Sequence, residues 1–340
     1  MNGAHFATRI LGLSVVLISG CVCQSHSPES AAPRPTSPST VSAPAQPATP
    51  PEPLYVPRHP ASQALTFQQI VARLQNLHYL PLTQAFVVHA HGRTTYHPFF
   101  LWPVPRELQK AADAQPWNAH NPFIRGALIQ FERANGSLFP AGVSEGWFHH
   151  KVVQQLFSPK VRTDPYPWQW VLVNKARGTD IPESLHLWRH SQFPGFLKEG
   201  RWIFHSRVNT GVLGSTPDGT WPIYQRLPST TMQGVFPIPI SWARYHTLAG
   251  QQVPQWAGSR LLQSARGLVD GHPVRWQPYR DPGVLWVNYF DNGRGIHYYP
   301  RASYGFPQSA GCVEEPFRSA PVAYHLLHYG VPVTISAARY

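Results

Sequence analysis

The stretch that decides the fold is Gly295–Glu315, which reads "GIHYYPRASYGFPQSAGCVEE". It places His297 15 residues before Cys312, with Ser309 and Gly311 just ahead of the cysteine. A thiol attacks a carbonyl only as the thiolate, so it needs a base nearby and donors for the oxyanion that forms. His297 can be this base, and Gly311 lets the backbone approach a tetrahedral intermediate closely. The backbone N–H groups around Gly311 and Cys312 are the natural oxyanion donors.

The cysteine count bears on whether Cys312 is a nucleophile or a small buried residue. Of the three cysteines, Cys21 and Cys23 lie in an N-terminal export segment, which leaves Cys312 without a partner in the folded part. Cysteines of exported proteins usually pair, so an unpaired one is either an inert buried thiol or a thiol kept free for chemistry. The order histidine then cysteine is the reverse of the papain-like order, which argues against that class.

Residues 1–20 have the form of a bacterial lipoprotein signal peptide. Arg9 precedes an apolar run, Ile10–Ile18, that is too short to span a membrane. The run ends in Ile-Ser-Gly-Cys, which resembles the lipobox and implies a lipid on Cys21, so we expect an extracytoplasmic protein anchored to the membrane at the cell wall. An ordinary cleaved signal and an uncleaved anchor are the alternatives, and the role of Cys23 is open.

Residues 21–60 are rich in Pro, Ser and Ala and hold almost no large apolar side chain. Such a segment cannot bury a core, so it predicts a disordered, extended tether. The chain as a whole has 37 prolines and a formal net charge of +12. That charge favours polyanionic partners, and the export signal favours wall polymers and anionic lipid over nucleic acid.

Residues 61–158 show helical periodicity in three places. Thr66 can cap a helix that begins at Phe67, Asn121 and Pro122 suit the start of a second, and Ser144–Phe157 is a third candidate. The pieces "VARLQNLHYLP", "ALIQFERANG" and "GVSEGWFHHKVVQQL" resemble, in order, the small three-helix peptidoglycan-binding domain, with a long insertion near residues 85–119. A helical spacer packed on the next domain is the alternative.

From about Tyr166 the chain changes to short β-like runs separated by Gly, Pro and Asn turns. "VLWVNYFDNGRGIHYY" predicts a hairpin whose turn is Asp291–Gly293, with His297 on the return strand. Ser319–Tyr329 reads as a helix that Gly330 ends. The predicted fold class is therefore α+β: a mainly β-sandwich catalytic domain with short helices, preceded by the small three-helix domain.

Several separated motifs resemble the L,D-transpeptidase (YkuD-type) catalytic domain over residues 168–336. They are Ile296-His297, Ser309-Ala310-Gly311-Cys312, the "GVPVTI" run from Gly330, and upstream Thr210-Gly211 with Thr216-Pro217-Asp218-Gly219. Motifs in this order are more specific together than any one alone. Two positions depart from the pattern: Ala310 stands where many members have His, and Glu314 where many have Arg. The second change puts substrate contacts in doubt.

The resemblance implies roles for individual residues. Cys312 would be the nucleophile, His297 the general base, Tyr298 the backbone carbonyl that orients the histidine, and Gly311 an oxyanion donor. Substrate contacts would come from Ser309, Thr216, Gly219 and Arg318. Arg294 and Arg301 are further candidates for binding substrate carboxylates, although all three arginines could equally be solvated surface charges.

The resemblance also implies a reaction: cross-linking of peptidoglycan stem peptides, donor and acceptor, through a cysteine thioester to give 3→3 links. An L,D-carboxypeptidase, in which water is the acceptor, and a non-catalytic peptidoglycan-binding lipoprotein are the alternatives. No cofactor and no metal are expected. The 18 histidines include pairs such as His89 with His91 and His325 with His328, but none forms a ligand set at zinc spacing.

Overall fold

A computed structural model describes the fold of the chain. The described residues are 65–88, 92, 94–136, 146–176, 181–190, 200–239, 266–269 and 272–336. The expected signal peptide, Cys21, Cys23 and the tether lie outside these ranges, as do His89 and His91. No helix in the described ranges is long and apolar enough to cross a membrane.

Two helices begin where the sequence predicts. Helix α1, Phe67–Asn76, starts at a capping box: Thr66 Oγ1 accepts from the Gln69 N–H at 3.2 Å, and Gln69 Oε1 accepts from the Thr66 N–H at 2.7 Å. Helix α3, Pro122–Ala134, is capped by Asn121, whose side chain accepts from the second and third N–H groups. Both caps satisfy donors that a helix start leaves unpaired.

The rest of the N-terminal region holds more secondary structure than the predicted three helices. The expected insertion holds an antiparallel hairpin, β1 (Leu82–Val88) with β2 (Thr94–Phe100), followed by helix α2 (Arg106–Asp113). The last helix, α4 (His150–Leu156), is shorter than the predicted Ser144–Phe157. One reason is Gly146, which has a φ of +67° and passes so close to the Arg125 carbonyl of α3 that a Cβ would not fit.

The first sheet of the C-terminal region has the strand order β5-β4-β3-β12-β6. Only its central pair, β3 with β12, is parallel. Its strands are β3 (Trp168–Asn174), β4 (Ser184–His190), β5 (Arg201–Arg207), β6 (Gly219–Pro222) and β12 (Pro332–Ser336). The first six residues of β3 are all buried, so this strand is covered on both faces.

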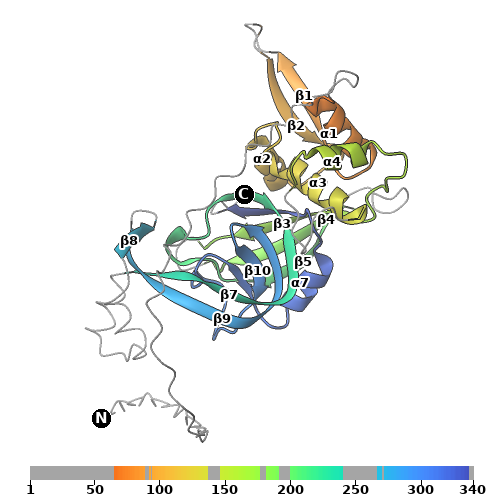
Figure 1. Ribbon diagram of the computed structural model, residues 1–340. Coiled ribbons are helices and arrows are strands. Elements are labelled where there is room, and N and C mark those ends of the chain that lie inside the picture. Colours follow the sequence, from red (N-terminus) through yellow and green to blue (C-terminus); the bar gives the residue numbers. More distant parts are fainter. Residues whose placement is uncertain are drawn as a thin grey trace, which may run out of the picture. The chain divides into compact units, whose positions relative to one another are not determined.

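The second sheet has the order β11-β10-β9-β7, with β8 paired to β9. Its strands are β7 (Gln225–Pro239), β8 (Arg266–Val269), β9 (His272–Asp291), β10 (Arg294–Tyr298) and β11 (Val313–Glu315). The predicted hairpin is present as β9 and β10, and Asn292 and Gly293 supply the positive φ of its turn. Strands β7 and β9 continue as a long ribbon past the other strands toward β8 (Figure 1).

The two sheets form a sandwich around a shared apolar core. Val171, Val173 and Leu187 of the first sheet belong to the same buried cluster as Phe290, Ile296 and Val313 of the second. The other face of the first sheet, with Trp168, Trp170 and Trp188, shares a second buried cluster with the helices α1, α2, α3 and α4. A mainly β sandwich with few helices is thus the architecture that the sequence predicts.

The helix after Cys312 is shorter than the predicted Ser319–Tyr329. Helix α7 spans Ala320–Leu326 and has Pro321 in its first turn. It ends because Leu327 turns to an extended conformation, with ψ of 151°, and is buried in the sandwich core. The chain then delivers His328 to a separate polar cavity, so tertiary contacts stop the helix before Gly330 does.

Candidate active site

His297 lies on β10, an inner strand of the second sheet between β9 and β11. Its side chain is buried, with 2% of its surface exposed. Nδ1 lies 2.9 Å from the backbone carbonyl oxygen of Tyr298. Since a carbonyl can only accept, Nδ1 carries a proton, and the other ring nitrogen of the neutral imidazole is left as the basic atom.

Cys312 is a free, half-buried thiol in the loop that leads into β11. It forms a side-chain hydrogen bond with His297. The chain brings the two residues together because β10 and β11 are parallel neighbours, with Ile296 opposite Val313 and His297 opposite Glu314. The loop between the strands therefore returns Cys312 to the level of Gly295, two positions before the histidine on β10.

Two hydroxyl groups fix the backbone around the cysteine. Ser309 Oγ accepts from the Gly311 N–H at 3.0 Å and donates to the Cys312 carbonyl at 2.6 Å. Thr216 Oγ1 accepts from the Gly211 N–H at 2.7 Å and donates to the Gly311 carbonyl at 2.8 Å. Ser309 and Thr216, both expected at the site, thus shape the nucleophile loop through its backbone.

These bonds refine the expected oxyanion donors. The Gly311 N–H already donates within the loop, whereas no bond of the described residues engages the N–H of Cys312. The Cys312 N–H is therefore the backbone donor available to an oxyanion. Gly311 remains indispensable in shape: its φ is +142°, and a Cβ would lie 2.9 Å from the Ser215 carbonyl oxygen and 3.0 Å from Nε of Arg294.

The electrostatic surroundings favour a protonated His297. Burial acts to lower the pKa of His297, but the hydrogen bond to Cys312, the charge of its thiolate, the Tyr298 carbonyl and the Glu314 carboxylate all act to raise it. The net result is a pKa above the ordinary value for histidine. Such a pair can exist as thiolate and imidazolium, the reactive form of a cysteine nucleophile.

Glu314, the departure noted in the sequence, forms an ion pair with Arg301. Nε and one terminal nitrogen of Arg301 each donate to one carboxylate oxygen of Glu314 at 2.7 Å. Arg301 is thereby committed to a protein carboxylate, and Arg294 likewise binds Asp291 at 2.8 Å and the Ser215 carbonyl at 2.9 Å. Both arginines thus already hold a protein carboxylate.

A buried glutamate that sequence reasoning missed supports the loop opposite Cys312. Glu183 is fully buried and accepts from the backbone N–H of Thr210 at 2.5 Å and from its hydroxyl at 2.6 Å. Burial raises the pKa of this carboxyl, and its hydrogen bonds oppose that rise. Nothing in the sequence distinguishes Glu183 from a surface residue that precedes a strand, since its role depends on a contact with a distant loop.

A groove of about 350 Å³ lies along the base of the β7–β9 ribbon. Its lining is Tyr224, Gln225, Leu227, Thr230, Thr231, Met232, Gln233, Tyr279, Tyr289 and Gly293. Tyr279, Tyr289 and Met232 share an apolar cluster with Cys312, so the groove adjoins the thiol. None of the lining residues carries a formal charge. An uncharged groove rich in hydroxyl and amide groups suits a peptide backbone.

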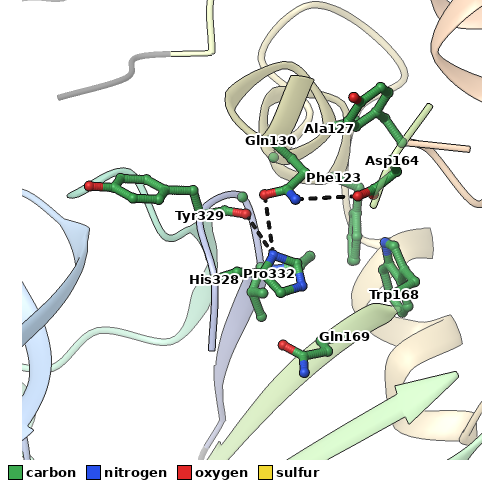
Figure 2. Close-up of a pocket in the computed structure, with 13 residues that line it drawn as sticks. Phe123, Ala127, Gln130, Asp164, Trp168, Gln169, His328, Tyr329 and Pro332 are labelled. Carbon is green, nitrogen blue, oxygen red and sulfur yellow. Dashed lines mark hydrogen bonds between the residues drawn. The ribbon is translucent and has the colours of Figure 1, made fainter. Parts of the chain in front are cut away.

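A second, much smaller cavity of about 10 Å³ lies between α3 and the turn that precedes β12. Its polar groups form a chain in which Gln130 contacts both His328 and Asp164 (Figure 2). The cavity has room for about one water molecule. It contains no thiol and is too small for a substrate, so we regard it as part of the packing between α3 and the sheet.

Two expected substrate residues lie apart from this centre. Gly219 begins β6 and packs on Trp221, and Arg318 is exposed just before α7. Among the contacts of the described residues, none joins either one to Cys312. The same residues contain no group of three or more His, Cys, Asp or Glu side chains that could hold a metal ion.

Comparisons with known proteins agree with the motif reading. Residues 187–335 match the family model of the L,D-transpeptidase catalytic domain. The matched segment lies within the expected span of 168–336 and makes up less than half of the chain. No curated protein matches the chain.

Solved structures that resemble the chain include three L,D-transpeptidases. One from Mycobacterium smegmatis has 16% identity and a TM-score of 0.30. The match covers 50% of this chain and 59% of the length of that protein. The catalytic domain of the E. faecium L,D-transpeptidase has 15% identity and a TM-score of 0.29. The match covers 49% of this chain and 96% of that domain. A mutant of the Enterococcus faecium enzyme has 12% identity and a TM-score of 0.31. The match covers 78% of this chain and 99% of that chain.

Proposed function

We propose that this L,D-transpeptidase-type domain is a cysteine acyltransferase that cross-links peptidoglycan stem peptides. The observation that carries the proposal is the Cys312–His297 pair inside the matched segment, with Nδ1 of the histidine fixed by the Tyr298 carbonyl. A buried imidazole that is oriented by one hydrogen bond and bonded to a free thiol is the arrangement that nucleophilic catalysis needs.

The first half-reaction would form a thioester. The Cys312 thiolate attacks the carbonyl carbon between the diamino acid and the terminal D-alanine of a tetrapeptide stem. The oxyanion accepts a hydrogen bond from the Cys312 N–H. As the intermediate collapses, the C–N bond breaks, and the departing nitrogen takes the proton of the His297 imidazolium. D-alanine leaves, and the acyl group remains on sulfur.

The second half-reaction would transfer the acyl group to an amine. The side-chain amine of a neighbouring stem loses its proton to His297 and attacks the thioester carbonyl. The C–S bond breaks and the thiolate is restored, next to a histidine that is again protonated. The product is a 3→3 link. The uncharged groove along Tyr224, Tyr279 and Tyr289 is a suitable cradle for the stem backbone.

The parts of the chain before the catalytic domain would bring it to its substrate. A lipid on Cys21 would hold the protein at a membrane surface, and the segment 21–60 would give it reach. The helical region would grip the wall. Gly219 and Arg318 remain candidates for contacts with a stem that extends beyond the groove.

The proposal is tested by the intact mass of the full chain, wild type and Cys312→Ala, after incubation with a disaccharide tetrapeptide and, separately, with a carbapenem. We expect an adduct on the wild type only, together with cross-linked dimer and free D-alanine. Free D-alanine with tripeptide and no dimer would identify an L,D-carboxypeptidase. A folded wild-type protein that forms no adduct but sediments with peptidoglycan would leave only the wall-binding reading.

A further inference from the structure

The ion pair of Glu314 with Arg301 has no part in the steps above, yet it lies beside the catalytic histidine. Glu314 is directly opposite His297 in the parallel pairing of β10 with β11. Directly paired residues of neighbouring strands point to the same face of a sheet. Glu314 has 4% of its surface exposed and His297 has 2%, so little water separates or screens the two side chains.

The position of the Glu314 carboxylate is tightly fixed. Its backbone N–H and carbonyl bond with Asn209 at 2.9 and 3.0 Å, and its side chain is held at both oxygens by Arg301. Arg301 also donates to the Gln308 carbonyl at 3.3 Å and lies 4.7 Å from the centre of the Tyr299 ring. That ring stands edge-on to the His297 ring at 6.4 Å. The charged pair is therefore part of the packing around the His297 ring.

The next residue offers a contrast on the same strand. Glu315 is also buried, and burial raises its pKa to about 8, although the charge of His297 and a hydrogen bond to Ser206 oppose this. Glu315 is therefore mostly protonated and uncharged at neutral pH. Of these two adjacent glutamates, Glu314 is the one that forms an ion pair with an arginine and lies opposite His297 in the sheet.

We propose that Glu314, held by Arg301, is a positioning residue that shifts the Cys312–His297 pair toward its thiolate–imidazolium form by placing a fixed negative charge beside the imidazole. The catalytic benefit of this shift rests on the proposed function, whereas the test described below does not. The charge acts on the histidine more than on the cysteine, because Glu314 is the direct neighbour of His297 in the sheet. The carboxylate is among the influences that raise the pKa of His297.

Several other polar groups lie near His297 on its own strand and on the two neighbouring strands. From β10 and the loop after it come Tyr298, which offers only its carbonyl, Tyr299 and the paired Arg301. From β11 and the loop before it come Cys312, Glu314 and Glu315. From β9, Asp281 accepts a hydrogen bond from Tyr299. Among these groups, Glu314 is the carboxylate whose charge acts to raise the pKa of His297.

The test is the pH dependence of Cys312 alkylation by iodoacetamide in the full chain, followed by the mass of the Cys312 peptide so that Cys21 and Cys23 do not interfere. Alkylation needs no peptidoglycan, so its outcome is independent of whether the chain cross-links stems. With Glu314→Gln we expect alkylation at neutral pH to slow about 3- to 10-fold and the pH midpoint of the rate to rise, because an opposite charge at close range favours the charged imidazole.

Two matched variants separate charge from packing. Glu314→Asp keeps the charge and should retain most of the wild-type rate. Glu315→Gln removes a carboxyl that is already neutral, so its rate at neutral pH should equal that of the wild type. The proposal is wrong if Glu314→Gln leaves the rate and midpoint unchanged, or if Glu314→Asp slows alkylation as much as Glu314→Gln does while both proteins keep the wild-type melting temperature.

Discussion

Two histidines of this protein, the buried His297 and the half-buried His328, have the same local geometry and opposite chemistry. Nδ1 of His297 lies 2.9 Å from the carbonyl of the next residue, Tyr298, and Nδ1 of His328 lies 2.9 Å from the carbonyl of the next residue, Tyr329. Yet the pKa of His297 is raised, whereas burial and the positive charge of Arg226 lower the pKa of His328 to about 4, against its two backbone hydrogen bonds.

The difference comes from the remaining partners. The other nitrogen of His328 faces a backbone carbonyl, that of Pro167, at 3.3 Å, and its ring stacks on Tyr166. His297 instead has a thiol and a carboxylate beside it. Burial lowers the pKa of both rings, and at His297 the hydrogen bond to the thiol and the adjacent negative charges outweigh that effect. A buried histidine is therefore a candidate base only where its neighbours can compensate its charge.

The largest test of this comparison replaces each histidine by glutamine, which keeps a polar side chain without a base. His297→Gln should slow acylation of Cys312 by a carbapenem about 10²- to 10⁴-fold, because the proton acceptor is lost. His328→Gln should leave acylation of the folded protein nearly unchanged and lower its melting temperature. Mass spectrometry of the adduct and a thermal melt measure both effects. Equal losses of acylation in the two variants would contradict the distinction.

A substitution at Gly330, two residues after His328, should disrupt the packing of this turn against α3. Gly330 has a φ of +80°, and an added Cβ would overlap the carbonyl oxygen of Gly126 in α3. Gly330→Ala should therefore lower the free energy of unfolding by about 2 kcal/mol or more. Gly293→Ala is the matched control, since Gly293 has a φ of +81° but open space at its Cβ. Urea unfolding should show a clearly smaller loss there; equal losses would mean that the clash does not matter.

The titratable groups of the His328 cavity predict opposing pH trends. Burial raises the pKa of Asp164 to about 7, against hydrogen bonds from Tyr166 and Gln130. The folded state thus holds this proton more tightly than the unfolded state, and stability falls as pH rises from 4 toward 7. The lowered pKa of His328 acts the other way: between pH 6.5 and 4 the unfolded state takes the proton first, so stability falls as pH falls.

Single variants should separate these trends. In Asp164→Asn the stability should rise with pH between about 4.5 and 6.5, and in His328→Gln it should fall, with slopes of at most about 1.4 kcal/mol per pH unit for one proton. Urea unfolding at several pH values gives the slopes. Slopes of the same sign in the two variants would show that the two groups do not titrate as their burial implies.

The smallest expected effect concerns the charge beside His328. Arg226 is held by the Asn288 side chain at 2.8 Å and by the Tyr324 carbonyl, and its positive charge acts on His328. Arg226→Gln should raise the pKa of His328 by less than about 1 unit, as measured by NMR titration of the imidazole. A fall in the pKa of His328 in this variant would contradict the claim that the charge of Arg226 lowers it.

Local signals in the sequence predicted much of this fold. Thr66 and Asn121 carry their own capping chemistry, and the Asp291–Gly293 turn carries its own backbone preference, so the structure has all three as predicted. The end of α7 was wrong, because burial of Leu327 ended the helix before its glycine could. The ribbon of β7 and β9 was missed, since its length depends on pairing across residues far apart in sequence.

The candidate site divides in the same way. His297 and Cys312 lie within one short stretch, and their order and spacing were enough to connect them. The contacts of Glu183 and Arg301 could not be predicted, because each acts through a residue that the fold brings to it: Thr210 and Glu314. The sequence marked Glu314 as a departure from the family pattern but could not say that an arginine would pair with it.

The parallel pairing of β3 with β12 has a consequence for the synthesis and folding of the two-sheet domain. β12 lies between β3 and β6, in the interior of its sheet, although it comes last in sequence among the strands of the described residues. A nascent chain that stops before Pro332 leaves both of those strands with an open edge, while His297 and Cys312 have already been synthesised. Folding of this domain must therefore wait for residues 332–336, and a truncation there removes the middle of the sheet rather than its border.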